Sequence, residues 1–487
     1  MEINDLTPAE LRVWQAFPRG EVVDFRPDAT EDTATGAAWG PERTLRASVL
    51  KALLVSAPQE DGEIAALRVL GARVTGGLNL THGVVEHPIR LAYSYFTDPP
   101  ELYGAQLRRI SLRASVLPGL DLGSARVDQW VQLSDCRVRG RVNMGGAHIS
   151  GSLRLDRAEL TAPGTSKPVL QLNQVVIEED LRGRRLRVHG EMVLNGSNVS
   201  GSVNLDGAHL KNPGRLALDA MTLGVGGDFL LRRVDVDGWT GLRGARIAGR
   251  LDLSYARLSN PGDMALRAAS CTVGELWLRR GEPLDGGLNL RRAQMDVLFV
   301  EPEKLPDRVR LDGLGYTTLT PHEPAERRLP MLERDVDGYV PHAYEQLTAA
   351  YRRIGDDHAA RLVQLAKQRR HRTTLPWYGR LWGHVQDATV GYGFRPMRAL
   401  GWLLSLLAVG SVTFAVHAPP PLKADEAPHF NPVFYTLDLL LPVISFGQEP
   451  AFAPQGGQQW LSYVLVLTGW ILATTVIAGV TRTVSRQ

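Results

Sequence analysis

The chain has 487 residues, with 55 basic and 52 acidic side chains and a formal net charge of +3. This near balance is not typical of a nucleic-acid-binding protein, so we do not expect nucleic acid as a partner. Its two cysteines, Cys136 and Cys271, are too few for a disulfide framework or a zinc motif, and they suit a reducing compartment. The first residues include acidic side chains and no apolar core, so we predict no signal peptide.

Residues 1–70 are expected to form an N-terminal helical cap region. Within it, the segment PERTLRASVLKALLV at 41–55 is predicted to be a helix. A stack of strands has open ends whose backbone groups need partners. This helix is therefore predicted to cover the first end of the repeat that follows it.

Residues 71–300 contain a repeat of 11 residues, with the pattern small-x-apolar-x-Gly-x-apolar-x-apolar. Successive pieces begin at Ala114, Ala125, Cys136 and Ala147. A fixed short period is typical of a solenoid, and the alternation inside each piece predicts strands. We therefore predict a mainly β fold, a right-handed β-helix in which two 11-residue half-coils make a coil of about 22 residues.

The repeat also predicts which side chains point inward and which point outward. The apolar positions are expected to stack as ladders inside the solenoid; examples are Leu153, Leu155, Val203, Leu205, Leu251 and Leu253. Outward positions after the small residue carry Arg126, Arg137, Arg246 and Arg257, and also His148 and His209. These arginines could form a basic stripe for anionic lipid or nucleic acid, but we favour a solvated face that blunts the sheet edge. The two histidines are expected to be surface residues rather than metal ligands.

Residues 301–341 are predicted to be a linker, and 342–396 a cytoplasmic helical and juxtamembrane segment. An apolar stripe from His342 to His371 predicts one or two helices. Basic residues gather at its end and before the next segment, and we expect them to lie near anionic lipid headgroups of the inner leaflet. These residues are Arg369, Arg370, Arg372, Arg395 and Arg398.

Residues 397–487 are predicted to form a transmembrane helical hairpin with an outer loop. The segments 399–418 and 460–481 contain no charged side chain and are each long enough to cross a bilayer. Arginines flank the hairpin outside both segments, whereas the loop 419–459 has one lysine. The positive-inside rule then predicts an inner-membrane protein with two spans and both termini in the cytoplasm.

Two stretches resemble parts of an ion channel. TVGYG at 389–393 has the letters of a potassium filter, but it precedes the first span, so we interpret it as a turn at the membrane surface. The apolar segment 431–450 lies between the spans and is too short to cross. It is either a loop at the outer surface or a re-entrant pore segment, which would require oligomerisation. Its pore-mouth candidates are Asp438, Ser445, Gly447, Gln448 and Glu449.

Motifs for catalysis are not found in the sequence. GVGGDF at 224–229 has the glycines of a phosphate loop, but it follows the solenoid register and no helix is predicted after it. No zinc-protease, CxxC or nucleophile-elbow motif is present. We therefore assign no catalytic, cofactor-binding or metal residue, and the cofactor stays unknown.

Several segments together resemble a known family. They include LTPAELRVWQAFPRG at 6–20, VGYGFRPMRALGWLL at 390–404, LLPVISFGQ at 440–448 and GWILATTVIAGVTR at 469–482. They are similar to an actinobacterial family commonly labelled membrane-associated oxidoreductase, with a pentapeptide-repeat-like solenoid and a two-span, ion-channel-like tail. The resemblance covers nearly the whole chain and implies a redox activity, without a catalytic motif to carry over.

Three functions follow as hypotheses. The first is a membrane-anchored solenoid that acts as an interaction or sensing scaffold, with a protein partner on the solenoid. The second is a homo-oligomeric two-span channel gated by the solenoid. The third is the oxidoreductase that the resemblance implies.

Overall fold

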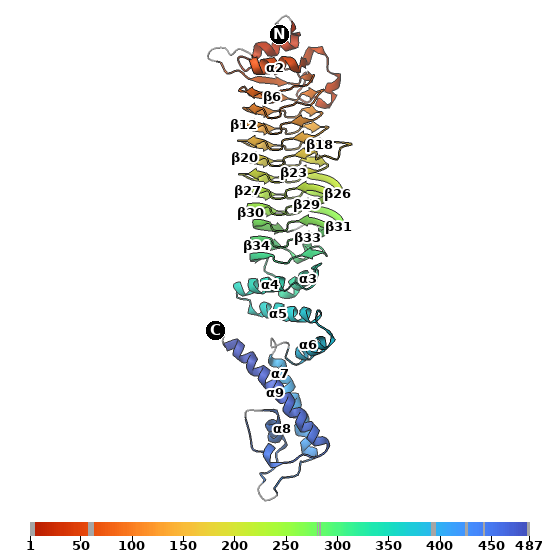
Figure 1. The fold of residues 1–487 in the computed structure, drawn as a ribbon, viewed down its shortest axis with the longest axis vertical. Helices are drawn as coiled ribbons and strands as arrows, with labels where there is room; N and C mark the ends of the chain where they lie inside the picture. Colours follow the sequence, from red (N-terminus) through yellow and green to blue (C-terminus); the bar gives the residue numbers. More distant parts are fainter. Residues whose placement is uncertain are drawn as a thin grey trace. The chain divides into compact units, whose positions relative to one another are not determined.

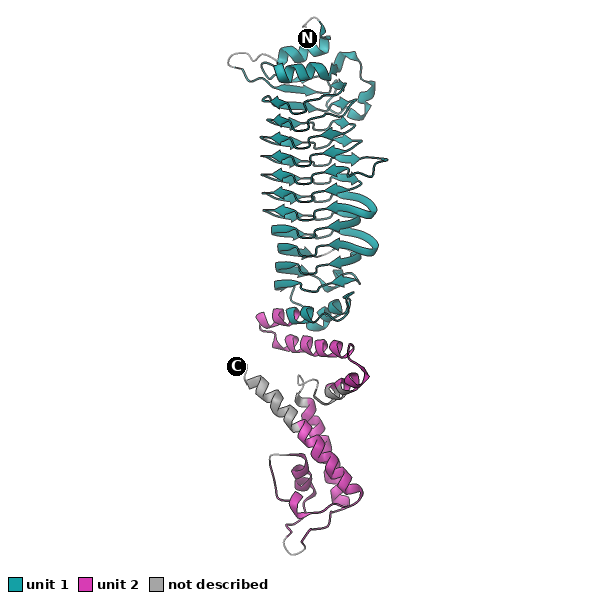
Figure 2. Ribbon diagram, in the orientation of Figure 1, with its two compact units in different colours: residues 1–346 teal, residues 347–487 magenta. Residues whose placement is uncertain are grey.

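We describe a computed structural model that covers residues 5–56, 63–279, 281, 284–390, 396–423, 427–441 and 444–484. The chain forms two compact units, Met1–Gln346 and Leu347–Gln487 (Figure 2). The first unit contains the strands of two large sheets, and the second consists mainly of helices. Each unit is described below by itself.

The first unit is a parallel β-solenoid of about 11 turns (Figure 1). Its strands form a 20-stranded and a 16-stranded sheet, and the pairings within both are parallel. Paired residues in successive coils are typically 22 positions apart, as in Arg126 with His148 and Val131 with Leu153. The predicted solenoid of 11-residue half-coils is thereby confirmed, and its right-handed sense stays a prediction.

The bounds of the strands show how short each half-coil segment is. The larger sheet contains β1 (Val23–Asp24), β3 (Leu67–Leu70), β5 (Val84–Val85), β6 (Ile89–Ala92), β8 (Gln106–Leu107), β9 (Ile110–Ser111), β12 (Arg126–Val127), β13 (Val131–Gln132), β16 (His148–Ile149), β17 (Leu153–Arg154), β20 (Val176–Ile177), β21 (Leu181–Arg182), β24 (Asn198–Val199), β25 (Val203–Asn204), β27 (Gly224–Val225), β28 (Phe229–Leu230), β30 (Arg246–Asp252), β32 (Thr272–Leu278), β34 (Gln294–Val300) and β36 (Gly315–Thr320). The smaller sheet contains β2 (Thr44–Arg46), β4 (Arg73–Thr75), β7 (Tyr95–Phe96), β10 (Val116–Leu117), β11 (Leu120–Asp121), β14 (Arg137–Val138), β15 (Val142–Asn143), β18 (Glu159–Thr161), β19 (Leu170–Gln171), β22 (Arg187–His189), β23 (Met192–Val193), β26 (His209–Asp219), β29 (Asp235–Gly241), β31 (Arg257–Arg267), β33 (Asp285–Asn289) and β35 (Val309–Arg310).

The small residue of each repeat marks a corner of the coil. The residue just before it has a left-handed backbone, with φ of 55° at Ser124 and 64° at Asp135. The small residues that follow, Ala125 and Cys136, are buried. Such a turn every 11 residues redirects the chain between the two sheets, which explains why the repeat has this period.

Apolar ladders fill the interior of the solenoid, as the repeat predicts. Leu153, Leu155 and Val203 are fully buried, and the other three predicted ladder residues have exposed fractions of at most 4%. Each coil places its apolar side chains directly over those of the coil before it, because the register is conserved through the stack. Burial of this kind is the main source of stability in a stacked repeat.

The N-terminal cap corrects one sequence prediction. Only the second part of segment 41–55 is an α-helix, α2 (Ala47–Ser56), because Pro41–Arg43 is a 3-10 turn and β2 pairs with β4. The open sheet edge supplies backbone hydrogen-bond partners to residues 44–46, and this pairing favours a strand there over a helix. Helix α1 (Pro8–Ala16) completes the cap, and β1 extends the other sheet by pairing with β3.

The other end of the solenoid lies beyond residue 300. Strands β35 and β36 belong to the two sheets, although they fall in the predicted linker 301–341. Helix α3 (Ala325–Glu333) follows them, and its Arg328 is almost fully buried. Arg328 donates to the carbonyl oxygens of Val300 and Pro321, so it satisfies backbone acceptors at this open edge.

The remaining elements are helices. Helix α4 (Pro341–Arg353) crosses the boundary between the units, and α5 (Asp357–Arg372) follows the left-handed Gly355, so the stripe from His342 to His371 forms two helices. The second unit also contains α6 (Trp377–Val390), α7 (Pro396–Val416), α8 (Pro432–Leu440) and α9 (Gly457–Val484).

Candidate functional site

Helix α8 packs against both long helices of the second unit, α7 and α9, which also contact each other. Two glycines permit this close approach. A Cβ atom at Gly410 of α7 would lie 2.4 Å from Cγ2 of Thr436, and one at Gly469 of α9 would lie 2.4 Å from the carbonyl oxygen of Leu440. A larger side chain at either position would therefore displace α8.

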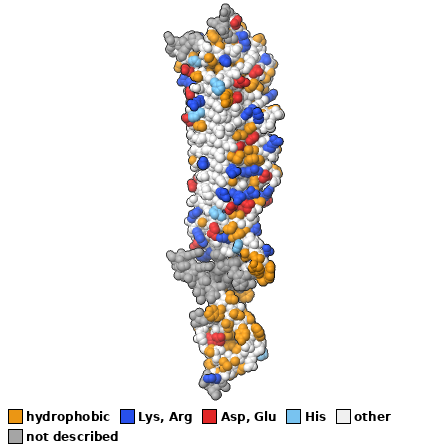
Figure 3. Space-filling view, in the orientation of Figure 1, with side chains coloured by type: hydrophobic (Ala, Val, Ile, Leu, Met, Phe, Trp, Pro, Cys, Tyr) orange, Lys and Arg blue, Asp and Glu red, His pale blue; other side chains and the backbone are white. Residues whose placement is uncertain are grey.

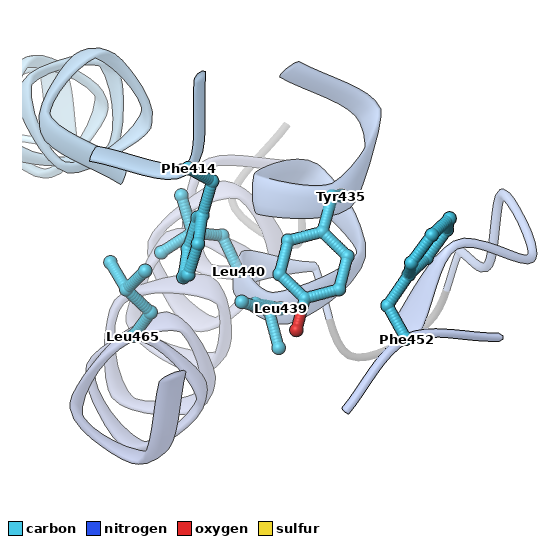
Figure 4. Packing of buried hydrophobic residues seen from close by; sticks show 6 residues of the cluster. All are labelled: Phe414, Tyr435, Leu439, Leu440, Phe452 and Leu465. Atoms are coloured by element: carbon cyan, nitrogen blue, oxygen red, sulfur yellow. The ribbon is translucent and has the colours of Figure 1, made fainter. Parts of the chain in front are cut away.

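An aromatic cluster fixes the same contact (Figure 4). Tyr435 of α8 is fully buried, and its ring meets that of Phe414 of α7 edge-to-face, with centroids 4.9 Å apart. Leu465 of α9 and Phe452, in the loop between α8 and α9, also belong to the cluster. Buried aromatic contacts of this kind give α8 a defined position between the helices.

The carboxylate of Asp438 organises the loop after α8. It accepts hydrogen bonds from the backbone N–H groups of Phe446 at 2.5 Å, Gln448 at 2.7 Å and Glu449 at 3.1 Å. Asp438 is buried, with an exposed fraction of 6%. Three amide donors offset the cost of burying the carboxylate, and they hold the loop against the helix.

Gln448 closes the same loop onto the start of α8. Its side-chain oxygen accepts from the backbone N–H of Asn431, and its amide nitrogen donates to the carbonyl of His429, each at 3.2 Å. The side chain of Asn431 in turn caps the helix by accepting from Val433 and Phe434. Sequence reasoning missed this cap, although Asn followed by Pro is a typical helix start.

The five predicted pore-mouth residues do come together, but with different roles. Asp438 and Gln448 are buried and bind backbone groups. Ser445, Gly447 and Glu449 are exposed. A carboxylate that already binds three amides is not a free pore-lining acid, so Glu449 is the exposed acid that remains of the predicted set.

The TVGYG string gives no site in the described structure. Thr389 and Val390 end helix α6, and residues 391–393 lie outside the described residues.

Large apolar side chains cover much of the surface of this unit (Figure 3). Leu404, Val409 and Val412 of α7 are each more than half exposed. Among the described residues, one helix, Arg398–Val416, is long and apolar enough to cross a membrane. The second predicted span falls within α9, where the side chains of 473–484 lie outside the described residues, so it stays a prediction.

The predicted juxtamembrane arginines are partly used within the protein. Arg369 donates two hydrogen bonds of 2.9 Å to the carboxylate of Asp387, and Arg372 donates a third at 3.4 Å. Burial raises the pKa of Asp387, but the bonds and charges of these two arginines outweigh it, and the pKa lies below its ordinary value. Arg370 lies on α5 and Arg398 on α7, and Arg395 is outside the described residues.

The outward residues of the solenoid are mixed in charge and partly paired. Arg137 pairs with Asp32 at 2.8 Å, and Arg257 with Asp235 at 3.6 Å. The two histidines also lie beside carboxylates, His148 with Glu178 and His209 with Asp235. No group of three or more metal-ligating side chains occurs among the described residues.

Two further sequence predictions concern the interior of the solenoid. The segment GVGGDF forms part of β27 and β28, as the register predicts, and not a phosphate loop. Cys136 and Cys271 are free and buried, and burial raises the pKa of each thiol to about 12.

Comparisons of the chain with protein families, curated proteins and solved structures find no match. The family resemblance noted in the sequence therefore stays a prediction.

Proposed function

We propose that the second unit is a membrane pore module, in which α7 and α9 span the bilayer and α8 with its loop forms a re-entrant segment. Copies of the chain would assemble around this segment, and the solenoid would be the cytoplasmic domain. The single observation that carries the proposal is the packing of α8 against both long helices.

The surface of α7 supports insertion into a membrane. Only 17% of the apolar stretch of this helix is buried within the protein, whereas a core helix of a soluble protein would be mostly covered. Exposed apolar side chains of this density are costly in water and favourable in lipid. Trp460 and Tyr463 are exposed near the start of α9, where aromatic side chains are typical of a membrane interface.

The depth of α8 favours a re-entrant segment over a loop at the surface. Leu440 contacts Gly469, which lies 12 residues after Gly457 at the start of α9. This distance corresponds to about 18 Å along the helix. The hydrocarbon core is about 30 Å thick, so the end of α8 would lie near its middle.

Backbone groups at that depth need hydrogen-bond partners, and the carboxylate of Asp438 is the acceptor for three backbone N–H groups. On the outer side of the loop, Ile444 and Phe446 remain about half exposed. In a membrane, irregular backbone persists only where protein or a water-filled cavity covers it. Neighbouring copies are therefore expected to cover the loop, with Glu449 at the mouth of the pore.

Ion flux through liposomes with the full-length protein tests the proposal. Gly410→Val, which would displace α8, and deletion of 431–450 should abolish flux. Gly401→Val is the matched control, because a Cβ atom at Gly401 of the same helix meets no neighbour, and it should conduct like the unmodified protein. Equal flux in Gly410→Val and the control would contradict the role of α8, and a silent unmodified protein would contradict the pore.

A membrane-anchored interaction scaffold is the second candidate. The extent of the solenoid favours it, since about 11 coils provide a long stacked surface of the kind that repeat proteins use for binding. The scaffold predicts a protein partner that stays bound to the solenoid when the helices of the second unit are deleted. The redox activity implied by the family resemblance is a separate proposal, and a visible absorption spectrum or nicotinamide turnover by the purified protein would test it.

A further inference from the structure

Five arginines gather on one face of the solenoid near its N-terminal end. They lie in or beside β3, β6, β9 and β17 of the larger sheet. We call this set the arginine face; its members are Arg68, Arg90, Arg108, Arg109 and Arg154.

The register of the sheet places three of these residues, Arg68, Arg90 and Arg154, in one row. In the strand register, Arg68 lies directly beside Arg90 of the next coil, and Arg90 lies beside Ser111 of the coil after that. The same row continues through Gln132 to Arg154. The row therefore spans five coils, or about 19 Å at about 4.8 Å per coil.

The charges of the arginine face are not neutralised by the protein. None of its five side chains forms an ion pair with another described residue, and the buried Nε atom of Arg154 has no hydrogen-bond partner. The carboxylate of Asp24 interacts electrostatically with Arg90, but Arg26 already binds both of its oxygens at 3.0 and 2.8 Å. Partial burial, together with repulsion from Arg68, Arg108 and Arg90, lowers the pKa of Arg109.

In later coils of the same face, several arginines form ion pairs with carboxylates. Arg184 pairs with Asp156 at 3.0 Å, and Arg250 with Glu275 at 3.3 Å. Arg232 pairs with Asp206. Carboxylates thus pair with these three arginines of the later coils, whereas the described residues offer no ion-pair partner to the five members of the arginine face, and this contrast points to an external anion.

We propose that the arginine face binds an acidic segment of a protein partner in an extended conformation. Guanidinium groups bind carboxylates in a bidentate geometry, and a row of about 19 Å matches about six residues of extended chain. This inference concerns the solenoid alone and holds whether or not the second unit conducts ions.

The surroundings of Trp130 favour a peptide over single-stranded nucleic acid. Bases bind to protein surfaces largely by stacking on open aromatic rings. The ring of Trp130 is already covered by the guanidinium groups of Arg109 at 5.6 Å and Arg154 at 5.3 Å. These come from the coils before and after it, so the ring is not open to a base, while the guanidinium edges stay available for carboxylates.

Fluorescence anisotropy of labelled octaglutamate with the full-length protein in detergent tests the proposal. The triple variant Arg68→Gln, Arg90→Gln, Arg109→Gln should lose at least about tenfold in affinity, and binding should weaken steeply with salt. The matched control removes three paired arginines elsewhere on the solenoid, as Arg157→Gln, Arg232→Gln, Arg250→Gln, and should bind within about twofold of the unmodified protein.

Three results would overturn the inference. They are equal binding of octaglutamine, an equal loss of affinity in the control variant, and tighter binding of an eight-nucleotide oligothymidine than of octaglutamate, which would assign the face to nucleic acid instead. Because Arg90 is exposed, the single substitution Arg90→Glu keeps the test valid if the triple variant does not fold. It should lower the affinity for octaglutamate, and unchanged affinity would count against the proposal.

Discussion

At the scale of single residues, the two units bury different kinds of side chain to satisfy backbone groups. The solenoid uses buried small residues at its corners, and Cys136 is one of them, with its thiol donating to the carbonyl of Leu112 at 2.8 Å. The second unit instead buries a carboxylate, Asp438, to hold an irregular loop. Both residues satisfy backbone groups, and neither is placed to react with an external substrate.

The two cysteines should not react with thiol reagents in the folded protein. Their pKa values of about 12 leave very little thiolate at pH 8, and both side chains are buried. Incubation with iodoacetamide followed by mass spectrometry should find both thiols unmodified, whereas in urea both should be alkylated. Rapid labelling of Cys136 without urea would show that the corner opens in the native state.

Replacement of Asp438 should disorder the loop without unfolding α8. Asp438→Asn keeps the size of the side chain but removes the charge and one acceptor oxygen. At least one of the three hydrogen bonds from backbone N–H groups is then lost, at a cost of about 2 kcal/mol. Proteolysis between 444 and 450 in detergent should become faster than in the unmodified protein. The control is Glu449→Gln, an exposed change that should leave the cleavage rate unaltered; equal rates in all three proteins would contradict the structural role of Asp438.

The role of Asp438 also shows where sequence reasoning stops. The sequence places it among acidic and polar residues of a loop between two apolar segments, which suggests a pore-lining charge. Its amide partners lie 8 to 11 positions further along the chain, and no periodic pattern connects them. The contacts of Gly410 and Gly469 are likewise tertiary, so a single sequence does not reveal that α8 packs against both long helices.

At the scale of elements, the solenoid was predictable because each coil repeats the same local instructions. The period, the inward ladders and the need for caps all follow from residues that are close in sequence. The caps themselves were less predictable. Residues 44–46 become a strand because β4 offers them partners, and β35 and β36 continue the sheets although the repeat is no longer visible in their sequences.

The N-terminal cap should depend on pH through Glu10. This carboxylate is buried and bonds to the guanidinium of Arg46 at 2.7 and 2.8 Å. Burial alone would raise its pKa, but the bonds to Arg46 and to the backbone lower it from 4.5 to about 2. The stabilisation is therefore fully present above pH 4.5 and is lost as the pH falls towards 2.

Glu10→Gln should accordingly destabilise the cap by about 3 kcal/mol at pH 7 and by much less near pH 2. Hydrogen exchange of the amides in α1 and β2, corrected for the intrinsic effect of pH, would measure this local stability. Glu21→Gln, an exposed substitution in the same region, should have little effect at either pH. A constant difference between Glu10→Gln and the unmodified protein from pH 7 to pH 2 would contradict the low pKa.

At the scale of the whole molecule, the two units follow different physical rules. The solenoid hides its apolar side chains inside the coils, while the second unit carries them on the surface of α7 and α9. The first arrangement is stable in water, and the second is favourable only where lipid or further protein covers it. The chain therefore joins a domain that is suited to water with one whose apolar surface needs lipid or further protein to cover it.

Separation of the units should separate these properties. A cut after Gly355 leaves α4 intact, since that helix ends at Arg353, and it keeps both caps of the solenoid. Residues 1–355 should remain in the supernatant after ultracentrifugation and give the circular dichroism of a β protein, because every open sheet edge keeps its cap. Residues 356–487 should instead sediment with membranes and resist extraction at high pH, as a helix that spans the bilayer does. If residues 356–487 were released from membranes by alkali, the exposed face of α7 would have to be covered by protein and not by lipid, and both the pore and the anchor would lose their basis.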